Sequence, residues 1–196
     1  MSAAPERTPL TDRGRRTREA LLSGARSVFE EQGFGATRMN DIATAAGTSH
    51  GTVYTYFQTK ESVLEAVVQQ VIDELLASLQ ASTAPDPTER VRDANARYLA
   101  AYAEHARLLR VVEEAAFSDA RFDEVLRQLR STHTSRVAAA IRRLQAEGAA
   151  SADLDPAASA AALCAMVEGF ARHHRADDHD TLTTLWARAL GLSTKE

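Results

Sequence analysis

The residues best suited to do chemistry lie in one short segment near the N-terminus. Ser49, His50, Thr52 and Tyr54 carry hydrogen-bonding side chains around Gly51. On a short helix these groups would be exposed together, and a glycine among them would let the backbone come close to a phosphate or a base edge. The pattern therefore favours nucleic-acid binding rather than catalysis.

A second set of polar groups interrupts the apolar faces of three later helices. One set repeats every three or four residues along a helix over 87–105, and the others lie on helices over 119–147 and 156–175. Ligand pockets are mostly apolar with a few placed polar groups, so we expect a small, mostly apolar effector to bind here. Alternatively, neighbouring helices satisfy each polar group within a solid core. The candidate effector residues are Asn95, Tyr98, Tyr102, His105, His133, Met166 and Phe170.

Nothing in the sequence indicates an enzyme. There is no nucleophile–base–acid arrangement, no glycine-rich phosphate loop and no HExxH motif, so we expect no catalytic residue and no cofactor. A histidine-rich stretch at 173–180 leaves an enzyme or a metal site as an alternative. Its adjacent histidines diverge on a helix and its acids are expected to cap the last helix, so we expect no metal.

Composition limits the remaining classes. The chain has 196 residues, 44% of them hydrophobic and 26% charged, which excludes global disorder. Residues 1–60 carry a net charge of +2 and residues 61–196 carry −6, so a polyanion partner is expected at one end only. The single cysteine, Cys164, and the lack of a signal peptide or membrane-length apolar run predict a cytoplasmic protein.

The hydrophobic period is helical throughout, so we predict an all-α chain of about nine helices. A disordered tail is expected at residues 1–11. Two short helices, joined by Ala46-Gly47-Thr48, match the helix-turn-helix plan. A broad apolar stripe on the helix over 60–79 predicts contact with two bodies. The expected helices span 13–32, a short segment from Thr37 to Gly47, 49–56, 60–79, 87–105, 107–117, 119–147, 156–175 and a last helix that ends near 190. Thr37 and Ser118 are the expected N-caps of the second of these and of the helix over 119–147, and Asp178 or Asp180 is the expected cap of the last.

The segment ATRMNDIATAAGTSHGTVYTYFQTKESVLEAVV resembles the DNA-binding region of the TetR (tetracycline repressor) family. The resemblance implies a homodimer with a DNA-binding domain over 12–60 and an effector-binding and dimerisation domain over 61–196. It also implies a regulator, most simply a repressor, that binds a pseudo-palindromic DNA operator and is released by a small molecule. Control by a protein partner, without a small-molecule pocket, is the alternative.

The resemblance also assigns roles to individual residues. Those expected to contact DNA bases or phosphates are Thr37, Arg38, Ser49, His50, Gly51, Thr52, Tyr54, Tyr56 and Lys60. The arginines at 13–18 either reach the DNA as a basic arm or remain solvated. The last two helices resemble the family's dimerisation pair, with expected interface residues Ala158, Ala162, Ala165, Gly169, Leu182, Leu185, Trp186 and Ala189.

Overall fold

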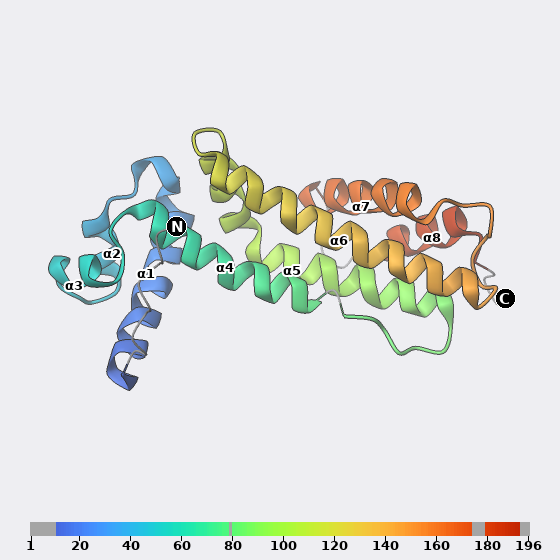
Figure 1. Cartoon of the computed structure of the whole chain (residues 1–196), viewed down its shortest axis with the longest axis horizontal. Coiled ribbons are helices and arrows are strands. Elements are labelled where there is room, and N and C mark those ends of the chain that lie inside the picture. Colours follow the sequence, from blue (N-terminus) through green and yellow to red (C-terminus); the bar gives the residue numbers. More distant parts are fainter. Residues whose placement is uncertain (1–10, 79, 174–178, 193–196) are drawn as a thin grey trace, which may run out of the picture. The chain divides into compact units, whose positions relative to one another are not determined.

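The computed structural model describes residues 11–78, 80–173 and 179–192, and within these residues it contains eight α-helices and no strand. The chain divides into two compact units, residues 1–69 and residues 70–196. Figure 1 shows the order of the helices, and one of them, α4 (Lys60–Ser78), contains the boundary between the units. No helix among the described residues is long and apolar enough to cross a membrane.

The first unit consists of α1 (Asp12–Ala36), α2 (Met39–Ala45), α3 (His50–Tyr56) and the first half of α4. Gly47 has a φ of 63° and ends α2, as the sequence predicts. The side chain of Ser49 then caps α3 by accepting from the Thr52 amide at 3.2 Å. The apolar side chains buried in this unit are Leu21, Leu22, Ala25, Val28, Phe29, Phe34, Ile42, Ala43, Val53, Phe57, Val63, Leu64, Val67 and Val68.

A glycine allows α1 to approach the turn of the helix pair. A Cβ placed on Gly24 would lie 2.8 Å from the Ala46 amide nitrogen and 3.0 Å from the Ala45 carbonyl carbon. Real Cβ atoms essentially never come this close to the backbone. The absence of a side chain at Gly24 therefore sets how closely α1 supports the connection between α2 and α3.

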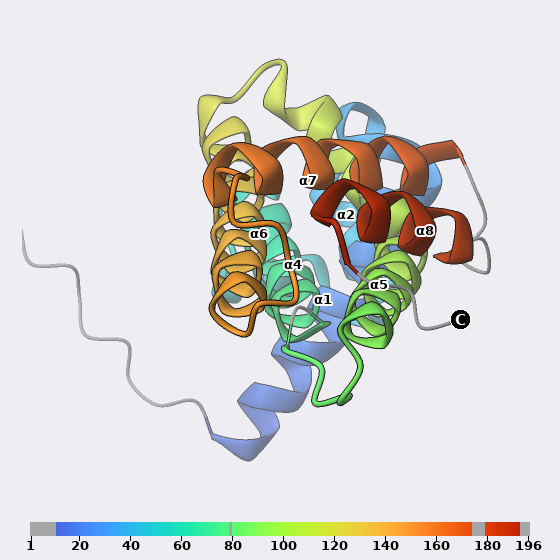
Figure 2. The same cartoon turned by 90° about the vertical axis from the view of Figure 1, so that its right-hand side faces the viewer.

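The second unit holds the rest of α4 together with α5 (Pro87–Ala116), α6 (Ala120–Ala146), α7 (Pro156–His173) and α8 (His179–Leu190). α5 and α6 run antiparallel (Figure 1), and α7 and α8 pack on them (Figure 2). Asp86 caps α5 through the amides of Thr88 and Glu89, at 2.8 and 3.1 Å, just before a proline in the first turn. The core of this bundle includes Leu99, Ile141, Leu163, Leu182 and Trp186.

The structure corrects three details of the predicted helices. The expected helices over 87–105 and 107–117 are one helix, α5, so there are eight described helices rather than nine. The N-cap of α2 is Arg38 and not Thr37, and the N-cap of α6 is Asp119 rather than Ser118. The predicted disordered tail falls mostly on residues 1–10, which lie outside the described residues.

Candidate functional site

The exposed face of α3 carries the hydrogen-bonding groups singled out in the sequence. His50 and Gly51 are exposed, and Tyr54 is 46% exposed although its ring lies against the His50 ring, with 5.0 Å between the centroids. Val53, on the opposite face, is fully buried and anchors the helix. α3 therefore exposes the imidazole of His50, the phenol of Tyr54 and the backbone at Gly51, while its opposite face is held in the core by Val53.

Two of the expected contact residues of α3 also have structural roles. The Ser49 hydroxyl lies 2.8 Å from the Thr52 hydroxyl in addition to accepting the Thr52 amide. This pair closes the first turn of α3, so both hydroxyls have partners within the chain while remaining at the surface. Tyr56, at the end of α3, is half-buried.

A shallow depression runs between α3 and the start of α1. It is bordered by Arg13 and Gly14 on α1 and by Gly51, Thr55 and Tyr56 on α3, with further threonine and serine side chains around it. Its lining contains an arginine and no carboxylate among the described residues. The start of the basic segment 13–18 therefore lies on the same surface as the exposed part of α3.

Thr37 and Lys60, which the family resemblance leads us to expect at the DNA, both make hydrogen bonds to carbonyls within the chain. Thr37 is only 2% exposed, and its hydroxyl donates to the Gly33 carbonyl at 2.7 Å. The Lys60 ammonium donates to the carbonyls of Phe34 at 2.8 Å, Gly35 at 3.2 Å and Thr37 at 3.4 Å, and it lies 4.5 Å from the centre of the Phe34 ring. Both side chains thus fix the connection between α1 and α2, and the neighbouring Arg38 side chain is exposed.

The second unit contains a cavity of about 490 Å³. Asn95 and Tyr98 on α5, His133 on α6 and Trp186 on α8 line it, together with residues 80–82 of the α4–α5 connection. Most of the other lining side chains are aliphatic: Val91, Ala94, Val137, Ala139, Ala140, Ile141, Leu144, Val167 and Leu190. An apolar chamber with a few polar groups has the composition of a small-molecule site.

Two aromatic rings belong to this cavity and to a smaller one. Tyr98 and His133 stack with 4.5 Å between ring centroids, and both line a second space of about 50 Å³ together with Tyr102. Burial lowers the pKa of His133 to about 4 and raises the pKa of Tyr98. Both side chains are therefore uncharged at neutral pH.

Two uncharged side chains that line the large cavity leave a buried donor without a hydrogen-bond partner, as does the Nε of Arg90, whose other two nitrogens bind Glu147. Asn95 is 2% exposed and Trp186 is 5% exposed, yet the Asn95 Nδ2 and the Trp186 Nε1 donate to no atom of the described chain. Buried donors are nearly always paired in folded proteins. These two donors therefore mark the cavity as a place where an acceptor is expected.

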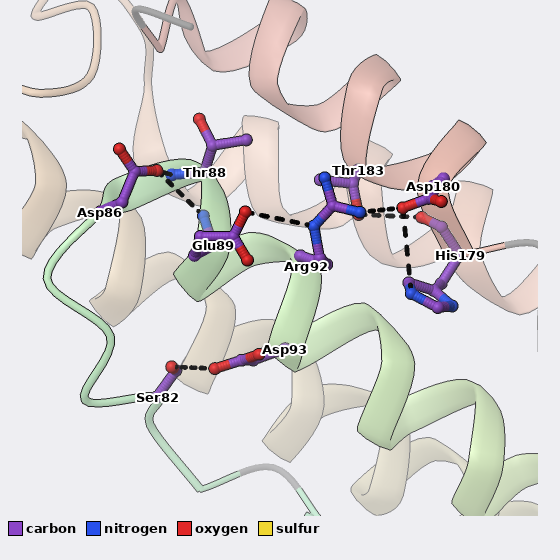
Figure 3. A network of polar contacts seen from close by, with 9 residues as sticks. All are labelled: Ser82, Asp86, Thr88, Glu89, Arg92, Asp93, His179, Asp180 and Thr183. Carbon is purple, nitrogen blue, oxygen red and sulfur yellow. Dashed lines mark hydrogen bonds and ion pairs between the residues drawn. The ribbon is translucent and has the colours of Figure 1, made fainter. Parts of the chain in front are cut away.

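A polar network fixes α8, which carries Trp186, to α5, which carries Asn95 (Figure 3). Arg92 of α5 pairs with Asp180 at the start of α8 and also with Glu89, one turn earlier, at 3.4 Å. Nearby, the Ser82 hydroxyl donates to Asp93 at 2.5 Å and holds the α4–α5 connection to α5. The two unpartnered donors thus come from helices that are tied together.

Three predicted effector residues do not line either cavity. His105 is 1% exposed, and its Nε2 lies 3.1 Å from the Glu74 carboxylate. Met166 and Phe170 are half-buried and pack on the hydrophobic core of the second unit.

Conversely, Trp186 was predicted from the sequence to lie in a dimer interface, and its place in the cavity was missed, because the apolar face of a helix does not show whether its own chain or a partner covers it.

Comparison with known proteins agrees with this division of the chain. A family model described as "Bacterial regulatory proteins, tetR family" matches residues 21–67, and one described as "Tetracyclin repressor-like, C-terminal domain" matches residues 88–184. The chain belongs to the TetR family. The resemblance noted in the segment around α2 and α3 is thereby confirmed.

Relatives of known sequence are transcriptional regulators. The HTH-type transcriptional repressor Rv3405c of Mycobacterium tuberculosis is 35% identical over 81 residues, which are 41% of this chain and 43% of the relative, so this match spans less than half of either protein. The HTH-type transcriptional regulator EthR of Mycolicibacterium smegmatis is 29% identical over 160 residues, covering 76% of this chain and 72% of EthR. The solved structure of Salmonella enterica GusR shares the fold, with a TM-score of 0.75 and 24% identity over 94% of this chain and all of that one.

α7 and α8, which the family resemblance leads us to expect at a dimer interface, divide into an outward and an inward face. Ala158, Ala162, Ala165 and Gly169 of α7 are exposed, and so are Leu185 and Ala189 of α8. Leu182 and Trp186 belong instead to the core of the protomer, with exposed fractions of 0% and 5%. Only the outward set is therefore accessible to a partner subunit.

The histidine-rich stretch of this TetR-family chain is only partly described. His174, Asp177 and Asp178 lie outside the described residues. Asp180 pairs with Arg92, and the His179 Nε2 lies 3.9 Å from the Asp180 carboxylate. The Asp180 carboxylate is therefore engaged in joining α8 to α5.

Proposed function

We propose that this TetR-family protein is a DNA-binding transcriptional regulator, most simply a repressor, that reads a pseudo-palindromic operator with α3. The observation that carries the proposal is the exposed group formed by His50, Gly51 and Tyr54 on a helix whose opposite face is buried. His50 and Gly51 would read base edges, and Tyr54 would contact a phosphate. Arg13, which borders the depression beside α3, would supply positive charge for the phosphates that flank the bases read by α3.

Selection of binding sites from random duplexes, followed by footprinting, tests this proposal. A symmetric site is expected, and the affinity for it should fall steeply with salt because phosphate contacts release counterions. His50→Ala should relax the base preference at one or two positions of each half-site and keep the salt dependence. Binding that has no symmetric site and no salt dependence would contradict the proposal.

The regulator is proposed to respond to a small molecule in the cavity of the second unit. Its volume of about 490 Å³ lies within the roughly 300–1,000 Å³ usual for ligand sites. The cavity favours control by a small molecule over control by a protein partner without a pocket. The binding signal would travel along α4, since this one helix belongs to both units, and a coupling of about 1–3 kcal/mol would release DNA roughly 5–150-fold.

A homodimer is proposed to form through the outward faces of α7 and α8. The α7 face is built from alanines and a glycine, which allow helices to approach closely, and Leu185 adds a large apolar side chain to the α8 face. Two such helix pairs would form an intersubunit four-helix bundle. Sedimentation of the purified protein measures this directly.

A further inference from the structure

The unpartnered donors of the large cavity specify part of the ligand that would fill it. The Asn95 Nδ2 and the Trp186 Nε1 line the same cavity from α5 and α8, and neither donates to an atom of the described chain. Leaving a buried donor unsatisfied costs free energy, whereas an acceptor oxygen in the cavity would recover it. The ligand therefore needs an oxygen acceptor within reach of these two donors.

The charged groups of the lining are all of one sign. Arg90, Arg136 and Arg143 line the cavity, and no aspartate or glutamate does so among the described residues. Arg90 is bound to Glu147 outside the lining, with distances of 3.1 and 2.6 Å, and Arg136 donates to the Leu76 carbonyl at 2.5 Å.

Arg143 differs from the other two arginines. It is exposed and its side chain makes no hydrogen bond within the described parts of the chain, and its charge acts on Glu147 only through space. An arginine with free donors at the edge of an apolar cavity suits a carboxylate, which it can bind with two parallel hydrogen bonds.

The two unpartnered donors and the Arg143 guanidinium would bind different parts of one ligand molecule. The ionisable side chains deep in the cavity, His133 and Tyr98, are both uncharged at neutral pH because they are buried. An anion placed among them would lose its hydration. Arg90 and Arg136, the lining cations on α5 and near His133 on α6, are already engaged with Glu147 and the Leu76 carbonyl. The acceptor near Asn95 and Trp186 is therefore uncharged, and the negative charge belongs at the arginine-lined edge.

We propose that the cavity binds an elongated apolar monocarboxylate that carries an uncharged oxygen acceptor, such as a ketone, within its body. Asn95 and Trp186 donate to the uncharged oxygen, and Arg143 binds the carboxylate. The aliphatic lining encloses the chain between them. This inference rests on the proposed function, since it names the chemical class of the effector.

Trp186 provides a direct readout, because it is the only tryptophan of the chain and lines the cavity. The full chain, without DNA, is titrated with the keto acids 5-oxohexanoate, 7-oxooctanoate and 9-oxodecanoate. The comparison ligands at each chain length are the plain acid, the 2-ketone and the alkylammonium, which for ten carbons are decanoate, 2-decanone and decylammonium. Binding is followed by Trp186 fluorescence and by calorimetry.

The best keto acid is expected to bind about tenfold more tightly than the plain acid of the same length, as two recovered hydrogen bonds predict. It should also bind about tenfold more tightly than the corresponding ketone without the carboxylate. Decylammonium should bind more weakly than decanoate. Equal affinity for keto acid and plain acid overturns the roles of Asn95 and Trp186, and equal affinity for keto acid and ketone overturns the role of Arg143. Failure of every keto acid to bind overturns the ligand class.

Two variants assign the contacts. Asn95→Leu should reduce the preference for the keto acid over the plain acid about threefold, because it removes one of the two donors and leaves only the Trp186 Nε1. Arg143→Gln should reduce the preference for decanoate over 2-decanone about tenfold. Arg142→Gln is the matched control, because Arg142 is exposed and outside the lining. An equal loss in both arginine variants would show that the effect is one of overall charge and overturn the contact with Arg143.

The result is independent of DNA binding. No operator is present in the titration, and the operator selection described above needs no ligand. A protein that selects a symmetric operator but shows none of these ligand preferences refutes the ligand inference alone. A protein that shows the preferences but binds no DNA refutes the proposed function and leaves the ligand class standing.

Discussion

The Lys60 ammonium lies 2.8 Å from the carbonyl oxygen of Phe34, at the end of α1, and rests over the ring of the same residue. It also donates to the carbonyls of Gly35 and Thr37. Helix ends leave carbonyls without partners, and this lysine satisfies three of them from the first turn of α4. A residue expected from the family resemblance to bind a phosphate thus has a structural task in the DNA-binding unit.

The first prediction concerns this lysine. Lys60→Ala should lower the free energy of unfolding of the first unit by about 1–3 kcal/mol, because it removes three charged hydrogen bonds to carbonyls, two of them partly buried. The salt dependence of DNA binding should remain that of the wild type. Chemical denaturation and binding at several salt concentrations measure the two effects, and Gln58→Ala, at an exposed neighbouring position, is the control. A flatter salt dependence without loss of stability would instead identify Lys60 as a phosphate contact.

The second prediction concerns the contact between α1 and the helix-turn-helix. Gly24→Ala should destabilise the first unit by about 1–3 kcal/mol, because its Cβ would lie 2.8 Å from the Ala46 amide nitrogen and the backbone would have to move. Thermal unfolding measures the loss. An unchanged unfolding temperature would mean that α1 and the turn can separate without cost.

The third prediction concerns Gly51, where, unlike at Gly24, an added side chain has room. A Cβ there would meet nothing closer than the Ser49 hydroxyl at 4.0 Å, and the position is exposed on α3. Gly51→Ala should therefore keep or slightly raise stability, by up to about 1 kcal/mol, since alanine favours the helix. Operator affinity should fall, because the added methyl group stands where the helix faces DNA. Unchanged affinity at unchanged stability would place Gly51 outside the interface.

The fourth prediction separates the two faces of α8. Leu185 is 44% exposed, whereas the adjacent Trp186 is 5% exposed. Leu185→Glu should yield folded monomers that bind the complete operator weakly, while Trp186→Glu should unfold the second unit because it buries a charge. Sedimentation and circular dichroism distinguish these results, with the exposed Gln128→Glu as control. A Leu185→Glu protein that remains dimeric would rule out this face as the interface.

Local signals predict much of this fold, and contacts between distant residues account for most of what they miss. Gly47 and Ser49 mark the end of α2 and the start of α3 by their own backbone and capping preferences, so the helix-turn-helix is visible in the sequence. Thr37 looks like an N-cap, but its hydroxyl pairs with the Gly33 carbonyl, and the helix begins one residue later.

The candidate effector site was only partly predictable for the same reason. Periodicity places Asn95, Tyr98 and His133 on inward helix faces, and all three line the large cavity. It cannot distinguish them from His105, which also faces inward but meets Glu74. Nor does the apolar face of α8 show that Trp186 packs within its own chain, since burial by a partner and burial by the same chain produce the same pattern.

The last prediction concerns pH. Burial lowers the pKa of His133 to about 4, below its ordinary value of 6.5. Between these values the unfolded chain binds a proton that the folded chain does not, so stability should fall as the pH decreases from about 6.5 toward 4. The full contribution is roughly 3 kcal/mol.

His133→Phe keeps an aromatic ring beside Tyr98 but removes the ionisation. Denaturation at pH 7 and at pH 4.5 should then show that the wild type loses about 2–3 kcal/mol more than the variant. Because all other titrating groups are common to both proteins, the difference between them isolates this histidine. Equal losses would mean that the His133 ring becomes protonated in the folded chain, and that the chamber between α5 and α6 admits enough water to solvate the charge.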